Sequence, residues 1–224
     1  MKLDVLEKEI VQCRKCPRLV AWREEVAGKK RRAYQGWTYW GKPVPGYGDP
    51  QAHVLVVGLA PGAHGSNRTG RMFTGDASGE FLYAALYRVG LANQPTSVHR
   101  DDSLRLTDIF ISAVCRCVPP DNKPLPEEIQ NCMPYLRAEI DCLEEIKGIV
   151  ALGRIAFEQV IRLYQEGCKP DRELIFHHGA RYKFGDELPW LIASYHPSRQ
   201  NTQTGRLTTS MFDHVWAEVR KALG

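Results

Sequence analysis

The sequence has no apolar run long enough to cross a bilayer, which takes about 20 consecutive apolar residues. Its first ten residues mix charged and apolar positions, so they lack the apolar segment of a secretion signal. Low-complexity stretches and internal repeats are also missing, and nothing in the composition divides the chain. With 224 residues, 43% of them hydrophobic, it can bury a full core. We therefore expect a monomeric, cytoplasmic protein that folds as one domain over residues 1–224.

A phosphate-binding loop of the form Gly-x-x-x-x-Gly-Lys-Ser/Thr is absent as well, which argues against a nucleotide-binding hydrolase of small molecules. The formal net charge of +4 is small, but basic residues gather at 29–32. Further arginines lie among the loop motifs described below (Arg68, Arg71, Arg199 and Arg206). This pattern favours an anionic partner. For residues 29–32 taken alone, an ordinary solvated face is an equally good interpretation.

Apolar segments with strand character alternate with segments of helical character. Strands are expected at 53–58, 106–114, 148–153 and 190–195, with a hairpin-like pair around 173–184. Helices are expected at 2–12, 78–90, 126–146, 154–166 and 209–222, and a long loop at 27–52. Strands that alternate with helices form a mostly parallel sheet that is covered on both faces. The predicted fold is a three-layer α/β/α domain with a central, mostly parallel, four-stranded sheet.

Two unusual loops directly follow predicted strands. Gly58-Leu-Ala-Pro-Gly-Ala-His-Gly65 follows the strand at 53–58, and His196-Pro-Ser-Arg-Gln-Asn201 follows the strand at 190–195. The carboxyl ends of parallel strands meet at one edge of a sheet, where open α/β folds usually bind their ligands. The first loop offers backbone N–H groups at Gly58, Ala60 and Gly62, and the second offers the His196 imidazole. The sequence thus predicts a binding crevice between them.

The chain has seven cysteines, and in a reducing compartment we expect thiols rather than disulfides. Cys13 and Cys16 are separated by two residues, which lets both sulfurs reach one metal. Cys117 and Cys132 form a second pair, from a proline-rich loop and the start of a helix. Four thiolates from two distant segments suit either a four-cysteine zinc site or a 4Fe–4S cluster, and the spacing does not separate the two.

The other three cysteines are expected to fill the core, where buried free cysteine is common and inert. These are Cys115, Cys142 and Cys168. Cys115 competes with Cys117 for the third ligand position, because it lies two residues earlier and would point the same way on an extended strand.

Four motifs follow one another along the chain: Gly58-Leu-Ala-Pro-Gly62, Thr69-Gly-Arg-Met-Phe73, Cys117-Val-Pro-Pro120 and His196-Pro-Ser198. Together they resemble the uracil-DNA glycosylase superfamily, and within it the iron–sulfur families. The resemblance runs from Cys13 to the last predicted helix. Leu59 stands where the commoner iron–sulfur family has Glu and the classical family has Asp. With the segments 39–50 and 196–208, this apolar residue makes the chain similar to family 5, the type B uracil-DNA glycosylases.

This resemblance implies a DNA repair enzyme that hydrolyses the N-glycosidic bond of uracil in DNA and leaves an abasic site for base excision repair. It also implies an N-terminal iron–sulfur-binding segment, with a 4Fe–4S cluster on Cys13, Cys16, Cys117 and Cys132. No lysine lies in a recognisable pocket motif, so we expect a monofunctional enzyme. A rival interpretation is a four-cysteine zinc module that binds nucleic acid without catalysis. It would leave the paired strand-end motifs unexplained.

A glycosylase must hold a base outside the stack and stabilise its departure. Phe73 is the candidate for stacking on that base, with a core position as the alternative. His196 is predicted to donate a hydrogen bond to the leaving base, although a lone histidine is more often structural. Asp76 is predicted to position or deprotonate water, or else to cap the helix that starts near Ser78. The resemblance implies that Asn122 contacts base or water, and a turn is the alternative role.

Two further expectations concern selectivity and DNA contact. The sister family has a base-reading Asn at the end of a central strand, and this chain has Ser112-Ala113 there. Loss of that amide would relax selection for uracil, so other deaminated bases such as hypoxanthine are predicted substrates. Ser198, Arg199, Gln200 and Asn201 are predicted to contact phosphates and the gap in the duplex, with solvated loop residues as the alternative.

Overall fold

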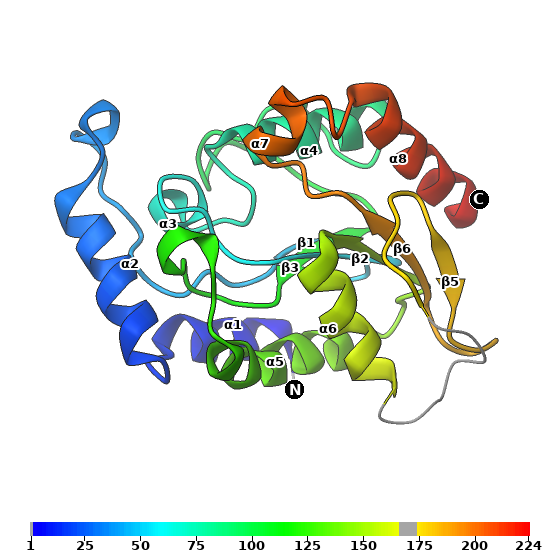
Figure 1. The fold of residues 1–224 in the computed structure, drawn as a ribbon, viewed down its shortest axis with the longest axis horizontal. Coiled ribbons are helices and arrows are strands. Elements are labelled where there is room, and N and C mark those ends of the chain that lie inside the picture. Colours follow the sequence, from blue (N-terminus) through cyan, green and yellow to red (C-terminus); the bar gives the residue numbers. More distant parts are fainter. Residues whose placement is uncertain (1, 166–173) are drawn as a thin grey trace.

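The computed structural model describes residues 2–165 and 174–224 as a mixed sheet with helices on both faces (Figure 1). Four central strands run parallel and are buried along their whole length: β2 (Val54–Gly58), β3 (Ile109–Ala113), β4 (Gly148–Leu152) and β6 (Trp190–Ser194). Their apolar runs lack alternation because both faces are covered, which is typical of parallel sheets.

The predicted count of four strands is wrong, because the sheet has six strands in the order β1-β3-β2-β4-β6-β5. The two additional strands are β1 (Tyr47–Gly48) and β5 (Arg181–Lys183), which pair antiparallel at the two edges. They have two and three residues, too few to leave a period of two in the sequence.

The hairpin expected around 173–184 forms differently. β5 lies within that range but pairs with β6, with Arg181 opposite Ile192. Residues 166–173, which include the start of that range, the end of the helix expected at 154–166 and Cys168, lie outside the described residues.

Helices cover the two faces of the sheet as two separate layers (Figure 1). On one face, Leu82 and Tyr83 of α4 (Ala77–Arg88) pack with Phe212 and Trp216 of α8 (Thr209–Leu223). On the other face, Leu136 of α5 and Phe157 of α6 join a second core. α5 spans Pro126–Cys142, α6 spans Arg154–Gln165, and α1 (Leu3–Gln12) packs against α5. The three-layer arrangement follows the alternation read from the sequence.

Within the described part of the chain, six elements were not expected: one full-length helix, β1 and four short turns or helices in loops. α2 (Pro17–Lys29) begins directly after the Cys13–Cys16 pair, with Pro17 at the first helical position, where the missing N–H costs nothing. The long loop holds the 3-10 turn η1 (Arg32–Tyr34) as well as β1. The others are α3 (Ser66–Thr69), η2 (Pro120–Asn122) and α7 (Arg199–Gln203), all in loops at the carboxyl edge of the sheet. Within residues 2–165 and 174–224, no helix is long and apolar enough to span a membrane.

Candidate active site

The two strand-end loops meet at a cavity of about 350 Å³ at the carboxyl edge of the sheet. The predicted residues Ala60, Gly62, Phe73, Asp76, Asn122, His196 and Ser198 all line it. Its other walls come from Leu59, Ser66, Met72, Ser78, Ala113, Asp121 and Gln200. Gly58, Arg199 and Asn201 were predicted for the site but lie outside this lining. Ser66 and Met72 carry no chemical signal that sequence reasoning could have used.

Phe73 is held in an uncommon backbone conformation beside the cavity. Its φ of +51° lies in the left-handed region, which a bulky residue adopts only under constraint from its surroundings. Two glycines leave the space that Phe73 occupies in this conformation. A Cβ at Gly58 would lie 2.9 Å from the Phe73 ring, and a Cβ at Gly79 would lie 1.7 Å from its carbonyl oxygen. Gly58 thus serves the site by leaving room for the ring.

His196 stacks against Phe73, with ring centroids 5.7 Å apart and an interplanar angle of 30°. Burial lowers the pKa of His196 to about 4, so the imidazole is neutral near pH 7. The loop around it is fixed by Asn201, whose Nδ2 donates to the His196 carbonyl at 2.8 Å. The Asn201 N–H in turn donates to Ser198 Oγ at 3.3 Å, which caps α7. The side chain of Asn201 therefore positions the His196 backbone.

Asp76 both caps a helix and lines the cavity. Its Oδ1 accepts from the Gly79 N–H at 3.0 Å at the start of α4, which is the capping role left open by the sequence. Its Oδ2 faces two loop glycines, since a Cβ at Gly62 would lie 2.8 Å from it and a Cβ at Gly65 only 1.9 Å. Burial raises the pKa of Asp76 above that of an ordinary aspartate.

Asn122 lies on the exposed rim of the cavity in η2. Asp121 and Asn122 have φ values of 53° and 56°, and Asn and Asp are the residues that best tolerate such a conformation after glycine. The Asn122 N–H donates to the Pro119 carbonyl at 3.2 Å. The turn-forming role and the rim position are thus both present in the structure.

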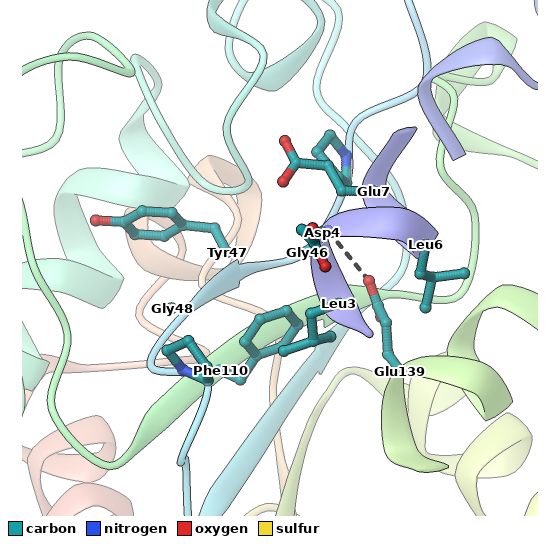
Figure 2. A pocket seen from close by; sticks show the side chains of 11 residues that line it. Leu3, Asp4, Leu6, Glu7, Gly46, Tyr47, Gly48, Phe110 and Glu139 are labelled. Atoms are coloured by element: carbon teal, nitrogen blue, oxygen red, sulfur yellow. Dashed lines mark hydrogen bonds between the residues drawn. The ribbon is translucent and has the colours of Figure 1, made fainter. Parts of the chain in front are cut away.

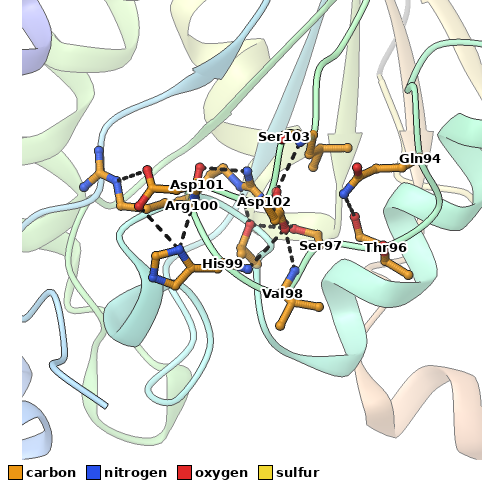
Figure 3. Close-up of polar contacts among 12 residues, drawn as sticks. Gln94, Thr96, Ser97, Val98, His99, Arg100, Asp101, Asp102 and Ser103 are labelled. Carbon is orange, nitrogen blue, oxygen red and sulfur yellow. Dashed lines mark hydrogen bonds and ion pairs between the residues drawn. The ribbon is translucent and has the colours of Figure 1, made fainter.

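Arg71 ties the Phe73 loop to the segment 97–102. Its buried guanidinium donates to Thr74 Oγ1 at 2.9 Å, Ser97 Oγ at 3.0 Å and Asp102 Oδ2 at 2.8 Å. Asp102 also accepts from the Val98 N–H at 2.8 Å, which Figure 3 shows with the neighbouring contacts of this segment. Burial opposes ionisation of Asp102, but Arg71 and the backbone N–H groups lower its pKa.

Two arginines that the sequence grouped with a basic surface are in fact buried. The Arg71 side chain is engaged as described above, and Arg68 is 3% exposed. The Arg68 guanidinium lies 4.0 Å from the ring centroids of both Tyr34 and Trp37. Neither side chain is available to an anionic partner at the surface, and both stabilise loops instead.

Of the predicted ligands, Cys16 and Cys117 share a small buried cluster with Leu19. Burial raises the pKa of the Cys16 thiol, and Cys132 and Cys13 are close enough to add to the shift. Burial likewise raises the pKa of Cys117 to about 12, opposed by the adjacent Arg23. A hydrogen bond from the buried competitor Cys115 lowers the pKa of Cys132 to about 7. Across residues 2–165 and 174–224, no three His, Cys, Asp or Glu side chains are arranged to hold a metal ion.

Residues 45–220 match the family described as the uracil DNA glycosylase superfamily. A type-5 uracil-DNA glycosylase of Thermus thermophilus is 51% identical over 229 residues, covering 100% of both chains. One from Mycobacterium leprae is 50% identical over 222 residues, or 98% of this chain and 95% of the relative. The chain belongs to the type 5 uracil-DNA glycosylases.

The prediction of family 5, made from Leu59 together with the segments 39–50 and 196–208, is confirmed. Type-4 members of the superfamily are more distant, as illustrated by the one from Pyrobaculum aerophilum. It is 34% identical over 164 residues, or 73% of this chain and 66% of the relative. Leu59 lines the cavity in this type 5 glycosylase, so the wall next to Ala60 carries no carboxylate at that position.

The end of β3 gives this type 5 glycosylase an apolar cavity floor. Ala113 lines the cavity, whereas Ser112 points to the other side of the sheet. There Ser112 Oγ donates to Glu139 Oε2 at 2.5 Å, and Arg116 Nη2 donates to the same oxygen at 2.5 Å. Glu139 Oε1 accepts from the Gly46 N–H at 3.2 Å beside a second cavity of about 270 Å³ (Figure 2). Ser112 is therefore a structural residue and offers nothing to a base.

Proposed function

We propose that this chain excises uracil from DNA by monofunctional hydrolysis of the N-glycosidic bond, leaving an abasic site for base excision repair. The observation that carries the proposal is the meeting of Phe73, His196 and Asp76 at one cavity. Membership of the type 5 uracil-DNA glycosylases gives it independent support. A target base has to leave the duplex to reach such a concave site, so the partner is DNA whose damaged base is flipped out.

Phe73 and His196 act on the base in this proposal. The Phe73 ring stacks on the flipped base, a contact that contributes about 1–3 kcal/mol. When the C1′–N1 bond breaks, its electron pair goes to N1 and negative charge spreads to the uracil oxygens. His196, neutral because of its lowered pKa, donates an N–H to one of these oxygens. A fixed neutral donor supports departure of the anion without giving up its own proton.

Asp76 acts on the sugar and on water. Its carboxylate offsets the positive charge that develops at C1′, and then accepts a proton from the water whose oxygen bonds to C1′. Its raised pKa suits a base, since general bases work best when their pKa approaches the working pH. Asn122 on the rim completes the water or base contacts. Ser198 and Arg199 at the start of α7 contact the DNA backbone, and Asn201 holds their loop.

The substrate range extends beyond uracil. Ala113 at the cavity floor has no amide with which to read a pyrimidine edge, and Ser112 points elsewhere. A cavity floor without an amide that a wrong base would leave unpaired discriminates weakly between bases. Hypoxanthine is the second base we propose.

A 4Fe–4S cluster on Cys13, Cys16, Cys117 and Cys132 completes the proposal. The donor chemistry fits, because the four thiols influence one another and buried Arg23 adds positive charge beside them. A 4Fe–4S cluster takes one thiolate on each of its four irons, so its ligands need not converge on a single ion. Cys117 rather than Cys115 packs with Cys16, which supports it as the third ligand. When bound, the cluster would join the N-terminal segment to the loop after β3. Hydrolysis transfers no electrons, so the reaction does not need it as a redox partner.

The test uses duplex oligonucleotides that carry a single uracil or a single hypoxanthine. They are incubated with the purified protein, which we propose to be a single-domain monomer, and are then treated with alkali to cleave abasic sites. We expect cleavage of both after alkali and an intact strand before it. Strand cleavage without alkali, or an enzyme–DNA adduct trapped by borohydride, would contradict the monofunctional mechanism. Iron in the protein supports the cluster, and stoichiometric zinc without iron contradicts it.

A further inference from the structure

Arg23 is a buried cation in α2, directly beside the cysteines. Its side chain is 2% exposed, and its Nη1 donates to Cys117 Sγ at 2.9 Å. The guanidinium also contacts the Cys13 carbonyl, at 3.3 Å from Nη1 and 3.4 Å from Nη2. Its Nε is buried without a hydrogen-bond partner among the described residues. Arg23 thus touches one predicted ligand through its sulfur and another through its backbone.

Among the residues that the structure describes, no buried carboxylate lies within ion-pair distance of Arg23. Glu24 lies within ion-pair distance, with its Oε1 3.8 Å from Nη2, but Glu24 is 46% exposed and is held by Arg14 at 2.6 Å. Arg116, which lies between Cys115 and Cys117 in the sequence, is different. It is paired with buried Glu139 at 2.5 Å. An arginine buried without a counter-charge is costly, so the fold has to supply negative charge near Arg23.

We propose that Arg23 is a positioning residue that supplies the buried counter-charge of the cysteine site and raises the reduction potential of its cluster. This rests on the proposed 4Fe–4S cofactor. A cluster with four thiolate ligands carries net negative charge, and its reduction adds another electron. A nearby cation and an N–H donor to a ligand sulfur both stabilise the more negative state. Arg23 provides both, whereas the charge of Arg116 is already balanced by Glu139.

The experiment compares the iron-loaded wild-type protein with Arg23→Met, Arg23→Lys and Arg14→Met. Arg14→Met is the matched control, because it removes one positive charge from the same segment at a side chain that is 62% exposed. We measure iron and sulfide per folded chain, the midpoint potential by spectroelectrochemistry, and the rate at which visible absorption is lost to a chelator. Arg23→Met should shift the potential to more negative values and lose its cluster about 10- to 100-fold faster, the usual effect of removing a residue that supports a metal ligand.

Arg23→Lys keeps the charge and should lie between Arg23→Met and wild type, and Arg14→Met should match wild type. If the wild-type protein contains no iron, the proposed cofactor is wrong, but the need for negative charge beside buried Arg23 is unaffected. Wild-type protein with iron, together with an Arg23→Met variant that matches Arg14→Met, would overturn the role of Arg23.

If Arg23→Met does not fold, wild-type protein with ¹⁵N-labelled arginine provides the test. Pulsed EPR of the reduced cluster should show nitrogen coupling that Arg23→Lys abolishes. The label is placed on the guanidinium nitrogens alone, because the backbone N–H of Arg116 also contacts a predicted ligand, Cys132. Absence of that coupling from the wild-type protein, or its undiminished persistence in Arg23→Lys, would contradict the proposal.

Discussion

Asp76 combines two functions whose chemical demands differ, because capping α4 needs only an acceptor whereas activation of water needs a carboxylate. The imidazole of His196 stays neutral near pH 7, because burial lowers its pKa. Phe73 depends on the absence of side chains at Gly58 and Gly79. At this scale, each site residue is therefore defined as much by its immediate contacts as by its own chemistry.

Substitution of Asp76 by Asn separates its two functions. Asn is a good N-cap, so Asp76→Asn should keep the midpoint of thermal unfolding but lose roughly 10²-fold in single-turnover excision. Asp76→Ala should lose the same activity and also about 1 kcal/mol of stability. Thr208→Ala is the control, because Thr208 caps α8 in the same way, through Met211, away from the cavity. It should lose stability and keep its excision rate. Full activity of Asp76→Asn would reduce Asp76 to a cap.

The pKa of His196 predicts how stability depends on pH. In the unfolded chain its pKa returns to 6.5, above the folded value of about 4, so the unfolded state binds the proton more readily. Its contribution is therefore fully present above pH 6.5 and is lost as the pH falls toward 4. Urea unfolding at pH 7.5 and pH 5 should show a smaller loss in His196→Gln than in wild type. Equal losses would show that the imidazole is not buried as a neutral group.

At the scale of elements, long apolar runs could be predicted from the sequence and short elements could not. The four central strands and the helices α4, α5 and α8 have enough residues to show a period or an uninterrupted apolar run. β1 and β5 exist because a neighbouring strand edge pairs with them, which is tertiary information. The cavity was predictable where a motif marked it, as at His196, but Met72 and Ser66 are placed there by the path of the loop.

The segment 97–102 lies outside the sequence motifs, and we predict that it supports the cavity through Arg71 and Phe73. Asp102→Ala removes the carboxylate that pairs with buried Arg71 and accepts from the Val98 and His99 N–H groups. Because this leaves the buried Arg71 guanidinium without its partly exposed partner, it should cost about 2 kcal/mol, and excision should weaken because Phe73 loses its support. Thermal unfolding and single-turnover rates measure the two effects. Asp101→Ala, at a neighbouring side chain that is 75% exposed, should change neither. Equal behaviour of the two variants would contradict the support role.

At the scale of the whole molecule, the cysteine site and the cavity are joined by hydrogen bonds through α2 and α3. The Arg23 carbonyl accepts from Asn67 Nδ2 at 3.2 Å, and the Asn67 N–H donates to the Gly62 carbonyl at 3.0 Å. Gly62 lines the cavity, so two contacts connect the helix that follows Cys16 with the wall of the base site. This path gives the proposed cluster a way to affect excision without taking part in the reaction.

Loss of a cluster ligand should therefore increase local unfolding in α2 and residues 62–70 more than in the rest of the molecule. In Cys16→Ala we expect faster amide hydrogen exchange in α2 and in residues 62–70, because these segments lose the anchor that holds Arg23 against Cys117. α8 packs on α4 in a separate core and serves as the internal control, with unchanged exchange. Hydrogen-exchange mass spectrometry of both proteins, alongside excision rates, makes the comparison. Uniform exchange across α2, residues 62–70 and α8 would show that the cysteine site stabilises the whole fold and has no particular connection to the cavity.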